Sequence, residues 1–132
     1  MQIRYSHISR NCMALLTVVF AIGACTPEKE SLEVTATAYN SLPAQTQGDP
    51  EIGAWGDRLD PDIQTIAVSR DLLSLGLTHN AVVEIDGMAG SWLVRDKLNR
   101  RFTKRIDVYM GKDLQAAREF GKQTVTIRWQ PK

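Results

Sequence analysis

Short stretches that alternate apolar and polar side chains recur along this chain of 132 residues, and they constrain its fold more than any other feature. In "EVTATAY", Val34 and Ala36 alternate with threonines, which is the period of a half-buried strand. In "TVTIRW", Val125, Ile127 and Trp129 share one face. Similar runs are "TIAV", "AVVEI", "SWLVR" and "RIDVYM". Six short strands predict a compact all-β barrel, because closing a sheet on itself removes its exposed edges.

Two short segments have helical character. Ser69 is placed to cap a turn in "SRDLLSLG". In "KDLQAAREFG", Asp113 is placed to cap a helix that Gly121 ends, with three residues toward the core, Leu114, Ala117 and Phe120. Residues 40–59 form a long loop rich in Gly, Pro, Gln and Asp, and loops of this length in compact domains are often functional.

The N-terminus has the pattern of an export signal. Arg4 and Arg10 precede an apolar run from Met13 to Ala24, and the segment contains no acidic residue. The run is too short for a comfortable membrane span, so we predict a signal peptide over residues 1–24.

The end of that run, "AIGAC", resembles the lipobox of bacterial lipoproteins. The resemblance implies cleavage before Cys25, acylation of this cysteine and anchoring in a membrane. Thr26 in the next position is compatible with the outer membrane in that family. The alternative is an ordinary secretory signal in which the cysteine is incidental.

Removal of this signal would leave 108 residues, 25–132, which is enough for one hydrophobic core. Cys25 would be the single cysteine, so no internal disulfide is expected. Loss of Arg4 and Arg10 leaves 14 basic residues against 15 acidic ones, a net charge of −1 that disfavours nucleic acid as a partner. We expect a monomer with a polar tether at residues 25–32 and one domain at 33–130.

The inventory of reactive side chains favours carboxylate chemistry. His79 is the only histidine after the signal, which argues against a multi-histidine metal site, and "LTHNA" reads as a turn unsuited to a Ser–His–Asp arrangement. No glycine-rich loop of the P-loop or Rossmann type is present, so acid and base work by carboxylates is what remains. The segment "RDKLNRRFTKRIDVYMG" sets Asp96 and Asp107 eleven positions apart, with basic residues between them.

The following motifs occur in order along the chain: "TATAY", "GAWGDRL", "IAVSRDLLSLGL", "VVEIDGMAG", "VRDKLNRRFTKRIDVYMG" and "VTIRW". Their order resembles the three-aspartate (3D) domain, which is also found as the barrel of membrane-bound lytic murein transglycosylase A. The resemblance spans residues 33–129 and implies a six-stranded double-psi β barrel with one or two short helices. It matches Asp107 to the catalytic acid of the family and Asp96 to its neighbouring aspartate. Where the family's first aspartate stands, this chain has Ser69, with Asp71 two positions later.

The same resemblance implies cleavage of the β-1,4 bond between N-acetylmuramic acid and N-acetylglucosamine, with a 1,6-anhydro product and without a cofactor. One carboxyl suffices, because the nucleophile is the substrate's own C6 hydroxyl. The candidate substrate-binding residues are Thr37, Tyr39, Trp55, Ser69 and Arg105.

Structural alternatives stand beside these roles. In these alternatives Asp107 pairs with Arg105, and Trp55 folds back over the core. The basic residues between Asp96 and Asp107 then form a turn that is merely solvated. Trp92 and Trp129 lie in strand patterns and are expected in the core.

Three functions therefore remain open. The first is a lytic transglycosylase of peptidoglycan turnover, lipid-anchored at the periplasmic face of the outer membrane. The second is a catalytically silent lipoprotein that binds peptidoglycan strands. Two departures from the family favour it: Ser69 replaces the first aspartate, and "DKLN" replaces the glycine-containing turn that usually follows the second aspartate. The third is an envelope protein that contacts a partner protein through the long loop.

Overall fold

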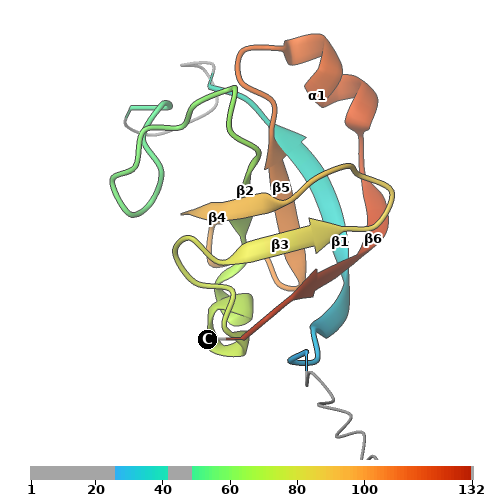
Figure 1. Ribbon diagram of the computed structural model, residues 1–132. Coiled ribbons are helices and arrows are strands. Elements are labelled where there is room, and N and C mark those ends of the chain that lie inside the picture. The colour runs from blue at the N-terminus through green and yellow to red at the C-terminus, as the bar shows by residue number, and fades with distance from the viewer. Residues whose placement is uncertain (1–25, 42–48, 132) are drawn as a thin grey trace, which may run out of the picture.

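Six strands close into one barrel in the computed structural model, which describes residues 26–41 and 49–131 (Figure 1). The strands are β1 (Glu30–Tyr39), β2 (Thr65–Val68), β3 (Val82–Ile85), β4 (Trp92–Lys97), β5 (Arg105–Tyr109) and β6 (Gln123–Trp129). This confirms the predicted all-β barrel. The predicted signal peptide, Cys25 and part of the long loop lie outside the described residues.

The order of strands around the barrel is β1-β5-β2-β4-β3-β6. Two pairs are parallel, β1 with β5 and β2 with β4, and the other four pairs are antiparallel. Parallel neighbours cannot be joined by a tight hairpin, so both parallel pairs bring together segments far apart in the sequence. This closed mixed sheet is the double-psi β barrel that the resemblance implied.

The barrel interior is filled by the apolar face of every strand. β-branched residues dominate it, and the fully buried members include Ile66, Val68, Val83, Val94, Ile106, Val108 and Ile127. Trp92 and Trp129 are buried as predicted, with 7% and 4% of their surface exposed. β1 begins at Glu30, inside the predicted tether, because Leu32 pairs with Ile127 and packs against the core.

Both predicted helical segments are present. Residues Arg70–Leu75 form a 3₁₀ helix, but the Ser69 hydroxyl does not cap it. In α1 (Leu114–Phe120), the Asp113 side chain accepts a hydrogen bond from the Ala116 N–H at 2.8 Å. Gly121 ends this helix with a φ of 62°, a conformation that glycine adopts without strain.

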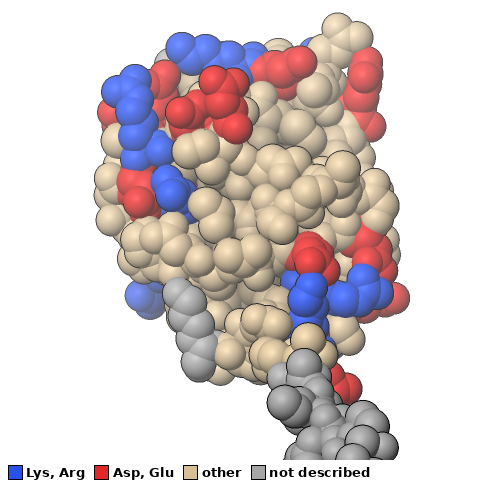
Figure 2. All heavy atoms as spheres, viewed as in Figure 1, with Lys and Arg blue, Asp and Glu red and all other residues tan. Residues whose placement is uncertain are grey.

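Charged side chains of both signs are interspersed on the face seen in Figure 2, which shows no broad patch of one sign. Ion pairs among the described residues include Lys29–Glu84 at 2.6 Å, Arg58–Glu51 at 2.8 Å, and Arg128–Asp86. Within the described residues, no helix combines the length and the hydrophobicity needed to cross a membrane.

Candidate active site

Strand register brings the two predicted aspartates into one row across the barrel. Thr37 of β1 is opposite Asp107 of β5, Asp107 is opposite Ala67 of β2, and Ala67 is opposite Asp96 of β4. Residues opposite one another on neighbouring strands project from the same face of a sheet. Ala67 is buried, with 2% of its surface exposed, and its small side chain lies between the two aspartates in this row. The row therefore sets two acids on either side of a small, apolar floor.

Asp107 is held by side chains. The Thr37 hydroxyl donates a hydrogen bond to its Oδ1. The Arg105 guanidinium donates to Thr37 Oγ1 from Nη2 at 2.8 Å and approaches Asp107 Oδ1 from Nε at 3.4 Å. Arg105 and Asp107 share a strand face, as the alternation predicted, while Ile106 and Val108 point into the core.

Burial raises the pKa of the Asp107 carboxyl, whose side chain is 15% exposed. The Arg105 charge and its hydrogen bond act against this rise in pKa, and the negative charge of Asp96 adds to it. The direction that prevails is upward, because the closest Arg105 nitrogen to Asp107 is at the long end of hydrogen-bond distance, whereas its short contact is to Thr37. The site thus shifts this carboxyl toward its protonated form relative to a solvent-exposed aspartate.

The segment before β5 is fixed by two polar side chains. Ser69 Oγ accepts the Arg105 N–H at 3.0 Å, and Asp71 Oδ2 accepts the Lys104 N–H at 2.9 Å. Ser69 is fully buried, so its hydroxyl positions the Arg105 backbone rather than facing the surface. The guanidinium of Arg105 also lies over the Phe102 ring, 4.3 Å from its centroid.

Asp96 has mainly main-chain partners. Its Oδ1 accepts the N–H of Lys97 at 2.8 Å and the N–H of Ala54 at 2.9 Å. Its Oδ2 lies 3.4 Å from the Tyr39 hydroxyl. Burial raises the pKa of Asp96, while the two main-chain N–H groups act to lower it. Burial, followed by the Asp96 charge, raises the pKa of the Tyr39 phenol, so this hydroxyl is a donor at neutral pH.

Trp55 lies partly buried against the core, and its ring stacks on His79 with centroids 5.2 Å apart and planes tilted by 27°. The Lys97 ammonium lies 4.7 Å from the centroid of the same ring. His79 Nε2 is 2.5 Å from Asp57 Oδ2. Sequence reasoning did not place Lys97, Asp57 and His79 around Trp55, and the closely spaced glycines of "GAWGDRL" were the one signal that this loop folds tightly.

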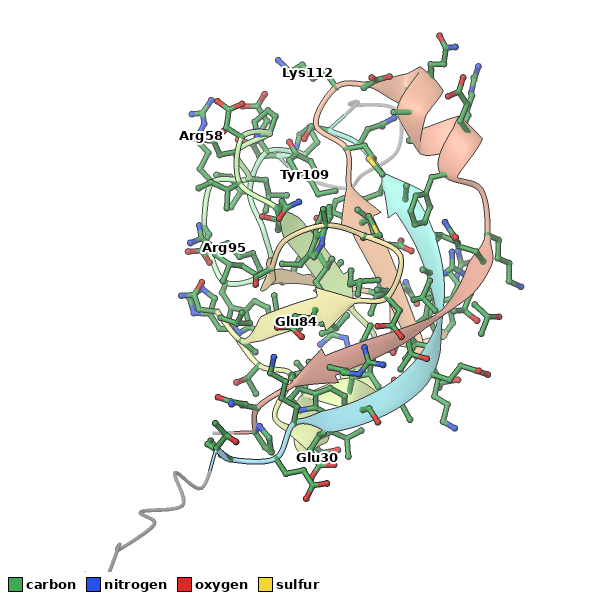
Figure 3. The ribbon with its side chains drawn as sticks, turned by 45° about the vertical axis from the view of Figure 1, so that its right-hand side comes forward. Glu30, Arg58, Glu84, Arg95, Tyr109 and Lys112 are labelled. Carbon is green, nitrogen blue, oxygen red and sulfur yellow. The ribbon has the colours of Figure 1, made fainter. Side chains whose placement is uncertain are left out.

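The carboxyl row is only partly accessible to solvent, since the Asp107 side chain is 15% exposed and Ala67 is 2% exposed. Three surface hollows lie elsewhere on the described part of the barrel, and one of about 490 Å³ is lined by Tyr109 and by residues of the 51–63 segment. Figure 3 shows Tyr109, Arg58 and Lys112 toward the same end of the barrel, away from Glu30. Within the described residues, no three His, Cys, Asp or Glu side chains are placed to hold a metal ion.

No family model and no curated protein matches the sequence. Solved structures do match. A mutant expansin from Clavibacter michiganensis, in complex with cellohexaose, aligns with 76% of this chain at 15% identity and a TM-score of 0.51. The apo form of the Clavibacter michiganensis expansin aligns at 16% identity and a TM-score of 0.52, and in both cases the match covers 50% of the expansin chain. A Streptomyces papain inhibitor aligns at 18% identity and a TM-score of 0.52, over 76% of this chain and 94% of its own. At these identities the likeness is one of fold.

Proposed function

We propose that this protein is a lytic transglycosylase-like enzyme that acts on the glycan strands of peptidoglycan, with Asp107 as its acid. The observation that carries the proposal is the state of this carboxyl. It is partly buried, its pKa is raised, and it stands in register with a second carboxyl across the small Ala67 floor. A general acid needs a proton at the operating pH and access to the bond it cleaves.

In the proposed reaction, the Asp107 carboxyl donates its proton to the oxygen that bridges N-acetylmuramic acid and N-acetylglucosamine. The C1–O bond breaks, and the N-acetylglucosamine side leaves as an alcohol. The Asp107 carboxylate then takes the proton of the muramic C6 hydroxyl as that oxygen bonds to C1. The sugar ends as a 1,6-anhydro product, Asp107 is protonated again, and no water is consumed.

The neighbouring side chains support each stage. Thr37 orients the carboxyl through its hydrogen bond to Oδ1. The negative charge of Asp96 raises the pKa of Asp107 and so favours the protonated acid before the bond breaks. Arg105 favours the carboxylate that exists between the two proton transfers.

Two further observations support a glycan as the ligand class. The motif order resembles the 3D domain through much of the described barrel, including "RIDVY" around Asp107. An expansin of the same fold has been solved with cellohexaose, a β-linked sugar chain, bound to it.

A second candidate function is a barrel that binds peptidoglycan without cleaving it. The contact between Arg105 and Asp107 favours this candidate, because a guanidinium beside a carboxyl stabilises the ionised form and opposes the protonated form that a general acid requires. The two candidates share a surface and differ only in product formation.

Digestion of purified sacculi separates them. The unaltered protein is expected to release muropeptides with anhydro ends, detected by mass spectrometry, and Asp107→Asn is expected to release none. Asp86→Asn is a matched control, because Asp86 lies outside the carboxyl row and is 47% exposed in its pair with Arg128. If neither the unaltered protein nor Asp107→Asn forms products while both co-sediment with sacculi, the binding function replaces the enzymatic one.

We also propose that the protein is a monomer anchored through lipidated Cys25 to the periplasmic face of the outer membrane. The support is the "AIGAC" motif. Cell fractionation tests it, because Cys25→Ala is expected to move the protein from the membrane to the soluble fraction. An unchanged distribution and no incorporation of labelled fatty acid would contradict the anchor.

A further inference from the structure

Residues 51–58 fold into a small unit with its own main-chain hydrogen bonds. Leu59 N donates to Glu51 O at 2.7 Å, and Gly53 N donates to Asp57 O at 2.8 Å. Ile52 and Arg58 form an isolated β-bridge between the two arms of the loop. The loop extends as a hairpin-like green segment beside β4 in Figure 1. Its position on the barrel depends on the contacts that join it to the strands.

Three such contacts lie close together. Ala54 N donates to Asp96 Oδ1, and Asp57 pairs with His79. Gly53 sits directly against β4, since a Cβ atom at this position would lie 2.2 Å from the Arg95 carbonyl oxygen. Glycine is therefore required where the loop meets the strand.

Asp96 is the contact that joins this loop to the carboxyl row. One carboxyl group accepts from Ala54 of the loop and from Lys97 of β4, and it faces the Tyr39 hydroxyl of β1. Hydrogen bonds from N–H groups to an ionised carboxylate are stronger than those between neutral groups. Within the described residues, Asp96 is the only member of the row containing Asp107 whose side chain accepts a hydrogen bond from the main chain of this loop.

We infer that Asp96 is a positioning residue, whose carboxylate latches the 51–58 loop to the barrel and thereby fixes Trp55 against Lys97 and His79, next to the carboxyl row. His79 stacks on the Trp55 ring, and the Lys97 ammonium lies over the same ring. The latched loop therefore presents an aromatic and a cationic side chain next to each other. The latch itself follows from the contacts above, and its effect on glycan handling rests on the proposed function.

The comparison of Asp96→Asn with Asp96→Ala tests the latch in the ligand-free protein. The amide oxygen of asparagine accepts the same two N–H bonds, whereas alanine accepts neither. In ¹H–¹⁵N spectra, the Ala54 amide and the Trp55 indole are expected to keep their shifts in Asp96→Asn and to move in Asp96→Ala. Hydrogen exchange of the Ala54 amide is expected to accelerate at least about tenfold in Asp96→Ala. Unchanged Ala54 exchange in a folded Asp96→Ala protein would overturn the inference.

Gly53→Ala provides a second route, in case Asp96→Ala does not fold. This variant pushes the loop away from the Arg95 carbonyl and leaves the carboxylate in place. The same Ala54 and Trp55 signals are expected to move. If they do not, the loop is held by contacts other than those at β4, and the latch is wrong.

Activity on sacculi separates the latch from a purely electrostatic role. Asp96→Asn removes a charge that raises the pKa of Asp107, so its activity is expected to decline at a lower pH than in the unaltered protein. Asp96→Ala is expected to lose activity at every pH and to lose more than Asp96→Asn does. Equal losses in the two variants would assign the effect to charge alone. If the unaltered protein forms no products, the proposed function fails, while the spectra still decide the latch.

Discussion

The β5 side and the β4 side of the carboxyl row each present one partly buried aspartate, yet they hold it in different ways. Asp107 is bonded to the side chains of Thr37 and Arg105. Asp96 is bonded to the main-chain N–H groups of Ala54 and Lys97. Thr37 and Arg105 reach Asp107 through rotatable side-chain bonds, whereas the two donors at Asp96 belong to the main chain of β4 and of the 51–58 loop. The difference is consistent with the proposed roles of Asp107 in proton transfer and of Asp96 in holding the loop.

The partners also differ in the protonation state that they favour. Two N–H donors stabilise an ionised Asp96 against the effect of burial on its pKa. At Asp107 the charge of Asp96 adds to burial, so the pKa of both carboxyls is raised but by different sets of neighbours. Environments that separate the behaviour of two nearby acids are typical of sites that carry out acid and base chemistry.

The largest expected difference between the two sides is in catalysis. Asp107→Asn removes the proton donor and is expected to lower product formation from sacculi by about 10²–10⁴-fold, the contribution of a typical general acid. Asp96→Asn keeps the hydrogen-bond acceptor and is expected to retain measurable activity below neutral pH. Initial rates measured by chromatography of anhydro-muropeptides test this contrast. An equal loss of activity in both variants would contradict different roles for Asp107 and Asp96.

Stability is expected to show the reverse contrast. Asp96→Ala leaves the Ala54 and Lys97 N–H groups without their acceptor, which is expected to lower the free energy of unfolding by about 1–3 kcal/mol. Urea denaturation measures the change, with Asp86→Ala as the exposed control, expected to change stability by less than about 1 kcal/mol. A loss in Asp96→Ala no larger than in the control would show that the latch is not stabilising.

The pH dependence of stability sharpens the comparison further. The pKa of Asp107 is raised in the folded protein, so this group's contribution to stability is fully present below its unfolded value of 3.8 and is lost as pH rises through the folded value. Asp107→Asn is expected to remove this loss and to flatten the decline of stability over that window. Thermal unfolding measured from pH 3 to pH 8 tests it. A steeper decline in the variant would mean that Arg105 dominates and that the pKa of Asp107 is lowered.

The smallest effect is expected at the outer attachment of the loop. The pair between His79 and Asp57 is partly exposed, with side chains 38% and 23% accessible. Asp57→Asn is therefore expected to lower the free energy of unfolding by less than about 1 kcal/mol, because pairs near the surface are screened by solvent. Urea denaturation of this variant and of Asp96→Ala ranks the attachment at His79 against the attachment at Asp96. A larger loss at Asp57 would move the main anchor of the loop from the barrel row to His79.

The barrel was predictable because its determinants are local. Alternation marked all six strands, and side-chain chemistry marked the Asp113 cap and the Gly121 end of α1. The start of β1 was not predictable, because Glu30 and Ser31 are polar and enter the strand only through pairing with β6. Ser69 had the right type and place for a helix cap, but its hydroxyl bonds to the distant Arg105 instead.

Only part of the site could be anticipated in the same way. The shared face of Arg105 and Asp107 follows from strand alternation, which is a local property. The row through Ala67 depends on register between strands that are not adjacent in sequence, and no local signal encodes it. The bond from Ala54 to Asp96 depends on a main-chain N–H, which every residue except proline carries, so side-chain identity gave no indication of it.

The parallel pairing of β1 with β5 has a consequence for how the protein comes into being. Thr37 and Asp107 are 70 residues apart in the chain, and their contact closes a loop that spans most of the domain. Contacts of such long range make folding slow, because the chain loses the entropy of closing the loop before the contacts form and stabilise it. Partly folded or truncated chains therefore lack the row that joins Thr37, Asp107 and Asp96, which is assembled only when the barrel is complete.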